Sequence, residues 1–240
     1  GKEDVDFLDK IVKAYKISSA DLENLPFIKY VASKQKPIIL STGMSTLKEI
    51  RETIKTIYQQ GNKKIILLQC TTEYPCAPID VNLKVMQTFS KKFRILTGYS
   101  DHTEGIDVPI MAANLGAVLI EKHFTLNKNF PGPDHKASIE PQELKEMINS
   151  IKSGEKRFVK EAMGDGIKII NPRESAIATF VKKSIFTKER IKRGSVIKRE
   201  SLTIKRPGNG IEPKYLELVV GKRTKIDLDE EEMISFANLY

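Results

Sequence analysis

All three histidines of the sequence lie in polar segments at or just beyond the ends of apolar runs. Segment Ser100–Thr103 follows the β-like run Phe93–Thr97, and Glu121–Thr125 follows the run Ala117–Ile120. The third histidine lies shortly afterwards, in Pro131–His135. Loops at the ends of parallel strands converge on one axis in an α/β barrel. Two imidazoles with nearby carboxylates could hold a divalent metal against an anionic substrate, so the pattern predicts an enzyme's reaction centre.

Short β-type runs recur through the first half of the chain, and their centres are continuously apolar instead of alternating. Such runs are typical of strands that are buried on both faces in a parallel sheet. The predicted strands are 14–18, 37–41, 64–70, 95–99 and 117–124. Segment Thr46–Gln59 between them predicts a helix, with a capping box formed by Thr46 and Glu49 and a stop at Gly61. Pro141 begins another helix, with apolar residues at helical spacing to Ile151.

Alternating strands and helices predict an α/β fold, a (β/α)8 TIM barrel of which about five of the eight βα units are present. The chain begins inside a helix-like segment, Val5–Val12, and we expect about three further units before it. An open five-stranded α/β sheet is the alternative. The pattern changes after Ile151, where glycines and a proline indicate a linker, and short strand-like runs follow. We therefore expect a partial barrel over 1–152, a linker over 153–175 and a small β-rich domain over 176–240.

Composition narrows the class of protein. No apolar stretch approaches the ~18 residues of a membrane span. Cys70 and Cys76 are too few for a secreted disulfide framework, so we expect a cytoplasmic protein. Residues 1–150 hold 20 Lys and Arg against 18 Asp and Glu, and residues 151–240 hold 20 against 13. The basic excess of the last third could bind nucleic acid. Its cations are mixed with acids and lack interleaved aromatics, which favours a solvated surface with a few cations aimed at an anionic substrate.

Seven motifs occur in an order that closely resembles the sialic acid synthase family, which includes N-acetylneuraminate, legionaminate and pseudaminate synthases. The motifs are Ala14–Ser19, Ile39–Met44, Tyr74–Pro75, Gly98–Thr103, Glu121–Thr125, Gly132–His135 and Lys205–Gly210. The resemblance covers essentially the whole chain. It implies a TIM barrel joined to a C-terminal antifreeze-like (SAF) domain, in a domain-swapped homodimer that needs Mn²⁺ or Mg²⁺. The N-terminal part of the barrel would lie outside this sequence.

The resemblance also implies an activity. Members of this family are transferases that condense phosphoenolpyruvate with the open-chain aldehyde form of an N-acylated amino sugar and release phosphate. We expect N-acetylmannosamine as the sugar and a nine-carbon 2-keto sugar acid as the product, used in bacterial surface polysaccharides. Legionaminate or pseudaminate synthesis, and a truncated non-catalytic fragment, remain alternatives. We expect no nucleic-acid or membrane partner.

The resemblance assigns roles by position. His102 and His123 match the metal-binding histidines, although strand-end histidines can also be satisfied by hydrogen bonds alone. Lys16 matches the lysine that meets phosphoenolpyruvate, and Glu121 matches a glutamate near that substrate or water. Four residues match positions around the same anion, namely Ser19, Ser41, Gly43 and Ser100. Five match positions near the sugar, namely Asp21, Thr72, Tyr74, Asp134 and Arg206. By the resemblance, Arg206 reaches the sugar of the partner subunit.

Overall fold

The structure is a computed structural model that describes residues 1–240. Five parallel strands form its main sheet in the sequential order β1-β2-β3-β4-β5. The strands are β1 (Tyr15–Ile17), β2 (Ile38–Ser41), β3 (Ile65–Cys70), β4 (Leu96–Asp101) and β5 (Ile120–Lys122). All five were predicted. Strand β4 continues two residues beyond its predicted end, because Ser100 and Asp101 still pair with Glu121 and Lys122 of β5.

Four helices connect successive strands, and one more lies at each end of this series. They are α1 (Lys2–Asp9), α2 (Leu25–Ser33), α3 (Leu47–Gln59), α4 (Val85–Phe93), α5 (Asp107–Asn114) and α6 (Pro141–Ser153). In α3 the side chain of Thr46 accepts a hydrogen bond from the backbone N–H of Glu49, whose carboxylate bonds back to Thr46, so the predicted capping box is confirmed. The apolar stripe of α3 is buried at Ile50, Ile54 and Ile57.

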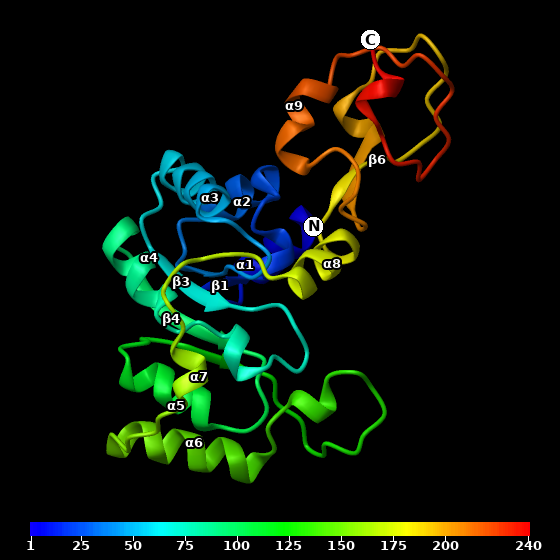
Figure 1. The fold of residues 1–240 in the computed structure, drawn as a ribbon. Coiled ribbons are helices and arrows are strands. Elements are labelled where there is room, and N and C mark those ends of the chain that lie inside the picture. Colours follow the sequence, from blue (N-terminus) through cyan, green and yellow to red (C-terminus); the bar gives the residue numbers. More distant parts are fainter.

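The strand order shows how the sheet is wound. Each strand pairs with the next one along the chain, whereas an open doubly wound sheet reverses its order at a switch point. Right-handed crossovers that always advance by one strand place the helices on one face and curl the sheet around the other. The result is a curled parallel half-barrel (Figure 1). Its largest core cluster, of 17 buried residues, includes residues of β1, β2, β3 and the first four helices.

The C-terminal region forms a smaller lobe apart from the half-barrel (Figure 1). It follows α7 (Lys160–Met163) and α8 (Pro172–Val181), and contains β6 (Ser184–Thr187), β7 (Leu202–Lys205) and α9 (Leu216–Val219). Strands β6 and β7 pair antiparallel, and nine buried hydrophobic residues give this lobe a core of its own. Helix α8 lies between the two lobes and runs across the boundary expected at 175/176. No helix in the structure combines the length and the apolar character that crossing a bilayer requires.

Candidate active site

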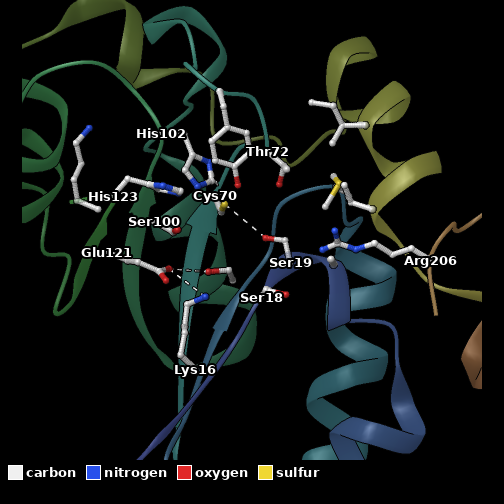
Figure 2. A pocket seen from close by; sticks show the side chains of 17 residues that line it. Lys16, Ser18, Ser19, Cys70, Thr72, Ser100, His102, Glu121, His123 and Arg206 are labelled. Carbon is white, nitrogen blue, oxygen red and sulfur yellow. Dashed lines mark hydrogen bonds and ion pairs between the residues drawn. The ribbon is translucent and has the colours of Figure 1, made fainter. Parts of the chain in front are cut away.

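A cavity of about 450 Å³ opens at the carboxyl ends of the strands, between the half-barrel and α8 (Figure 2). Ten of the thirteen site residues expected from the sequence line it: Lys16, Ser19, Ser41, Thr72, Tyr74, Ser100, His102, Glu121, His123 and Arg206. Strand register explains this convergence. Cys70, Ser100 and Glu121 are Cα partners across β3, β4 and β5, so they form one row on the same face of the sheet.

An ion pair crosses the floor of the cavity (Figure 2). Lys16 Nζ lies 3.2 Å from Glu121 Oε2, and Ser41 Oγ donates to the same oxygen at 3.3 Å. The two charged side chains stay about one-third exposed to the cavity. The pair joins the first and last strands of the sheet, and its lysine remains accessible to an anion that enters the cavity.

His102 is held by the backbone of the neighbouring strand end. Its Nδ1 lies 2.6 Å from the carbonyl oxygen of Thr71, which requires the proton on Nδ1 and leaves Nε2 unprotonated in the neutral ring. Burial favours the neutral ring, but the nearby Cys70 thiol and the Thr71 carbonyl outweigh burial and raise the pKa of His102. Burial alone would raise the pKa of the Cys70 thiol, but His102 and Ser19 outweigh burial and lower it.

His123 lies close to His102, with 5.4 Å between ring centroids (Figure 2). Its pKa is lowered by burial first and then by the charge of His102. Tyr74 packs against both rings, with centroids 4.1 Å from His102 and 5.5 Å from His123, and burial raises the pKa of its phenol.

This pair of imidazoles fits a divalent ion that keeps other ligands. A metal-bound histidine usually donates its second ring N–H to a backbone carbonyl or carboxylate, as His102 does toward Thr71. No group of three or more His, Cys, Asp or Glu side chains is arranged to hold a metal. The protein would therefore supply two nitrogens, and water or substrate the remaining positions.

Beside the histidines, a tight cluster surrounds Gly43. Its N–H donates to Ser19 Oγ at 2.9 Å, and a Cβ placed on this glycine would lie 2.1 Å from Thr72 Oγ1. Only glycine fits there. Thr72 Oγ1 is buried without a hydrogen-bond partner, and Cys70 Sγ lies 3.6 Å from Ser19 Oγ. Reading the sequence gave Cys70 no role, although its place at the end of β3 was the signal that it would face the cavity.

Three of the expected site residues do not line the cavity. Gly43 lies behind Ser19 and Thr72, as just described. Asp21 instead pairs with Lys183 at 2.6 Å. Asp134 lies on an exposed loop. The expected contacts of Asp21 and Asp134 with a sugar remain predictions.

Comparison with known proteins identifies the chain. Residues 1–168 match the NeuB family model, and residues 182–239 match the SAF domain model. The N,N'-diacetyllegionaminic acid synthase of Campylobacter jejuni is 46% identical over 235 residues, covering 97% of this chain and 69% of that protein. This chain belongs to the NeuB family of sialic acid synthases.

Two further relatives show how far the similarity extends. The human N-acetylneuraminate-9-phosphate synthase is 36% identical and covers 96% of this chain, which spans 63% of that protein. A crystal structure of the spore coat polysaccharide biosynthesis protein SpsE from Bacillus subtilis has a TM-score of 0.91 at 32% identity, over 100% of this chain and 71% of that one. This NeuB-family chain thus spans about two thirds of the length of its relatives.

One residue of this NeuB-family chain lies differently from the expectation. The resemblance placed Arg206 in the site of a partner subunit, but Arg206 lines the cavity of its own chain (Figure 2). The loop that carries it docks on α8, where Gly208 N–H donates to the Thr179 carbonyl at 2.9 Å. A Cβ at Gly208 would lie 2.5 Å from Lys182 Cβ, so this close approach requires glycine. Ile177 and Val181 of α8 complete the same wall, and sequence reading missed both.

Glu174 is a third residue of α8 that the sequence did not single out. It is 1% exposed, and its Oε1 accepts the backbone N–H groups of Met44 at 2.9 Å and Thr72 at 2.8 Å. The carboxylate therefore ties α8 to the ends of β2 and β3. The sequence analysis had assigned Glu174 to the linker over 153–175, where no buried role was expected for it.

Proposed function

We propose that the chain carries the site for condensing phosphoenolpyruvate with an N-acylated amino sugar, N-acetylmannosamine in the first instance, to give a nine-carbon 2-keto sugar acid and phosphate. One observation carries the proposal: a single cavity gathers a lysine, two imidazoles and an arginine at the strand ends. The relatives named as legionaminic acid and N-acetylneuraminate-9-phosphate synthases support the same reaction class.

The floor of the cavity suits an anion. Lys16 supplies a fixed positive charge, and the hydroxyls of Ser19, Ser41 and Ser100 supply donors around it. An incoming phosphate or carboxylate would take over the contact that Glu121 now makes with Lys16. Glu121 would then be free to hold a proton or orient water beside the reacting carbons. Donors fixed in place before the reaction stabilise developing charge without reorganisation.

His102 and His123 would hold the Mn²⁺ or Mg²⁺ that this reaction class needs. Such an ion would supply Lewis-acid chemistry at the sugar aldehyde. Tyr74 packs on both rings and would help to hold them in place. Arg206, from the opposite wall, has several donors in a fixed plane for sugar oxygens, and it orients the sugar between the imidazoles and the anion.

The remaining expectations about architecture belong to the same proposal. Edge strands β1 and β5 each leave one side unpaired in this chain, and further βα units would close the half-barrel into a (β/α)8 barrel. The partial barrel over 1–152, the linker over 153–175 and the SAF domain over 176–240 are the units we propose, with assembly as a homodimer in the cytoplasm.

Phosphate release tests the reaction. The chain is incubated with Mn²⁺, N-acetylmannosamine and phosphoenolpyruvate whose bridging oxygen carries a heavy isotope. We expect labelled phosphate, because water captures C2 and the C–O bond of the intermediate then breaks. Label retained in the sugar acid contradicts the scheme. A folded chain that releases no phosphate with this sugar or with a doubly N-acetylated hexosamine contradicts the activity.

A further inference from the structure

A buried ion pair joins the two residues that precede the histidines in the sequence. Lys122 Nζ lies 2.7 Å from Asp101 Oδ2, and the side chains are 3% and 0% exposed. No other ion pair of the structure has both side chains so completely buried. Burying two charges costs more than their attraction returns unless further hydrogen bonds satisfy them.

Further hydrogen bonds do satisfy this pair. Asp101 Oδ1 accepts the hydroxyl of Tyr99 at 2.9 Å and the backbone N–H of Thr103 at 2.9 Å. Lys122 Nζ also donates to the carbonyl oxygen of Thr103. The pair therefore binds the peptide groups on both sides of Thr103 and fixes the backbone that follows His102.

The sequence positions of the pair connect it to both rings. Asp101 directly precedes His102, Lys122 directly precedes His123, and Asp101 and Lys122 are Cα partners across β4 and β5. One ion pair thus links the two strand ends at the residues next to the imidazoles. The backbone carbonyls of the histidines are held as well, by the N–H of Cys76 at 2.8 Å on His102 and that of Ile139 at 2.9 Å on His123.

We propose that Asp101 and Lys122 are positioning residues that set the separation of the His102 and His123 rings, and thereby the affinity of the site for a divalent cation. This inference rests on the proposed function, because it takes the two imidazoles as the metal ligands. Lys122 is one of the residues that line the cavity, but its side chain is 3% exposed and its ammonium group is bound by Asp101 and the Thr103 carbonyl. The pair acts through the backbone, since sliding β5 by even a fraction of an ångström against β4 would move one ring relative to the other.

The affinity of the chain for Mn²⁺, measured by the electron paramagnetic resonance of the free ion, tests the inference. Lys122→Met keeps the apolar stem and removes the donors, and Asp101→Asn keeps the shape and removes the charge. Loss of an outer-shell partner typically weakens metal binding about 10- to 100-fold, and we expect that range for both variants. Tyr99→Phe removes one hydrogen bond and retains the ion pair, so we expect a smaller loss, of about 2- to 5-fold.

Lys182→Met is the matched control. It breaks the part-buried ion pair between Lys182 and Glu23, which lies away from the histidines, and it should leave Mn²⁺ affinity unchanged even where it lowers the melting temperature. Unchanged affinity in folded Asp101→Asn and Lys122→Met would overturn the inference. If neither variant folds, unchanged affinity in Tyr99→Phe overturns it and a loss supports it.

A measurement without metal separates this inference from the proposed function. In the metal-free chain we expect nuclear Overhauser effects between the rings of His102, His123 and Tyr74, and their loss in Lys122→Met. A wild-type chain with no affinity for Mn²⁺ contradicts the metal-dependent function, and the ring contacts then decide the positioning role alone. Ring contacts that persist in Lys122→Met contradict that role.

Discussion

The cavity has two walls that are built in different ways. One wall consists of strand ends, where Lys16, Ser41, Ser100 and Glu121 follow from the register of a parallel sheet. The other wall consists of α8 and the loop that carries Arg206, which are attached by a few specific contacts. We call these the strand wall and the α8 wall.

The two walls differ in the roles that their side chains could have. The residues of the strand wall are placed by the hydrogen-bonded register of the sheet, and this wall carries the groups that would bind the anion and the metal. The α8 wall carries Arg206 and apolar side chains that would close over the sugar. Changes to the strand wall should therefore affect the reaction itself, and changes to the α8 wall should affect stability or sugar binding.

The largest effect is expected on the strand wall. His102→Ala and His123→Ala each remove one of the two imidazoles and should lower metal-dependent phosphate release by roughly 10³-fold, about 4 kcal/mol, while circular dichroism stays unchanged. The measurement is turnover as a function of Mn²⁺ concentration. The same Mn²⁺ dependence in both variants and in the wild type would show that these residues are not the ligands.

On the α8 wall the largest effect should be on stability. Glu174→Ala leaves the backbone N–H groups of Met44 and Thr72 without their acceptor and the buried Lys168 without its nearby opposite charge. We expect a loss of about 3–5 kcal/mol in unfolding free energy, or roughly 6–20 °C in melting temperature.

Glu174→Gln is the control, because its amide oxygen can still accept both backbone bonds. It should lose less than half as much stability as Glu174→Ala in a thermal melt. Equal losses in the two variants would mean that the charge near Lys168, and not the acceptor, holds α8 in place.

The two walls also differ in how well the sequence predicted them. The strands were predicted because continuous apolar runs are typical of strands that are buried on both faces of a parallel sheet. Side chains at the ends of such strands then converge. Nine of the ten expected residues that line the cavity lie at or just after strand ends for that reason, and Arg206 is the exception. The α8 wall depends on contacts between residues far apart in the sequence, such as Gly208 against Lys182. Such contacts produce no periodic pattern in the sequence from which they could be predicted. Asp21 shows the same limit, since nothing local indicates that Lys183 would pair with it.

Arg206→Ala should affect the sugar and leave phosphoenolpyruvate nearly untouched. The loss of a charged hydrogen bond typically costs about 1.5–3 kcal/mol, so we expect a reduction of roughly 10- to 150-fold in kcat/KM for the sugar. Steady-state kinetics with each substrate varied in turn will separate the two effects.

The same variant tests whether Arg206 acts within its own chain. Mixing Arg206→Ala with His123→Ala should restore no activity, because each chain then lacks one component of its own cavity. Recovery of activity after confirmed subunit exchange would show that a partner supplies the arginine, as the family resemblance implied.

A pH effect is expected where the α8 wall meets the loop after β1. Burial raises the pKa of Glu23 to about 7, although the ion pair with Lys182 opposes this. The folded state therefore binds the proton more tightly than the unfolded state, and stability from this group is present at low pH and lost as pH rises from about 4.5 through about 7. The loss should be on the order of 3 kcal/mol. Glu23→Gln should flatten this part of the melting-temperature profile, and parallel profiles would contradict the assignment.

The smallest effect is expected on the surface of the C-terminal lobe, far from both walls. Arg199 pairs with Glu217, but the side chains are 48% and 71% exposed, so water and salt screen the attraction. Exposed ion pairs typically contribute about 0.2–1 kcal/mol, and Arg199→Ala should accordingly shift the melting temperature by less than about 4 °C. Its turnover and Mn²⁺ affinity should match the wild type, because the lobe has its own core and reaches the cavity only through Arg206. A change in turnover would mean that the lobe affects the α8 wall. It would contradict the division of roles between the strand wall and the α8 wall.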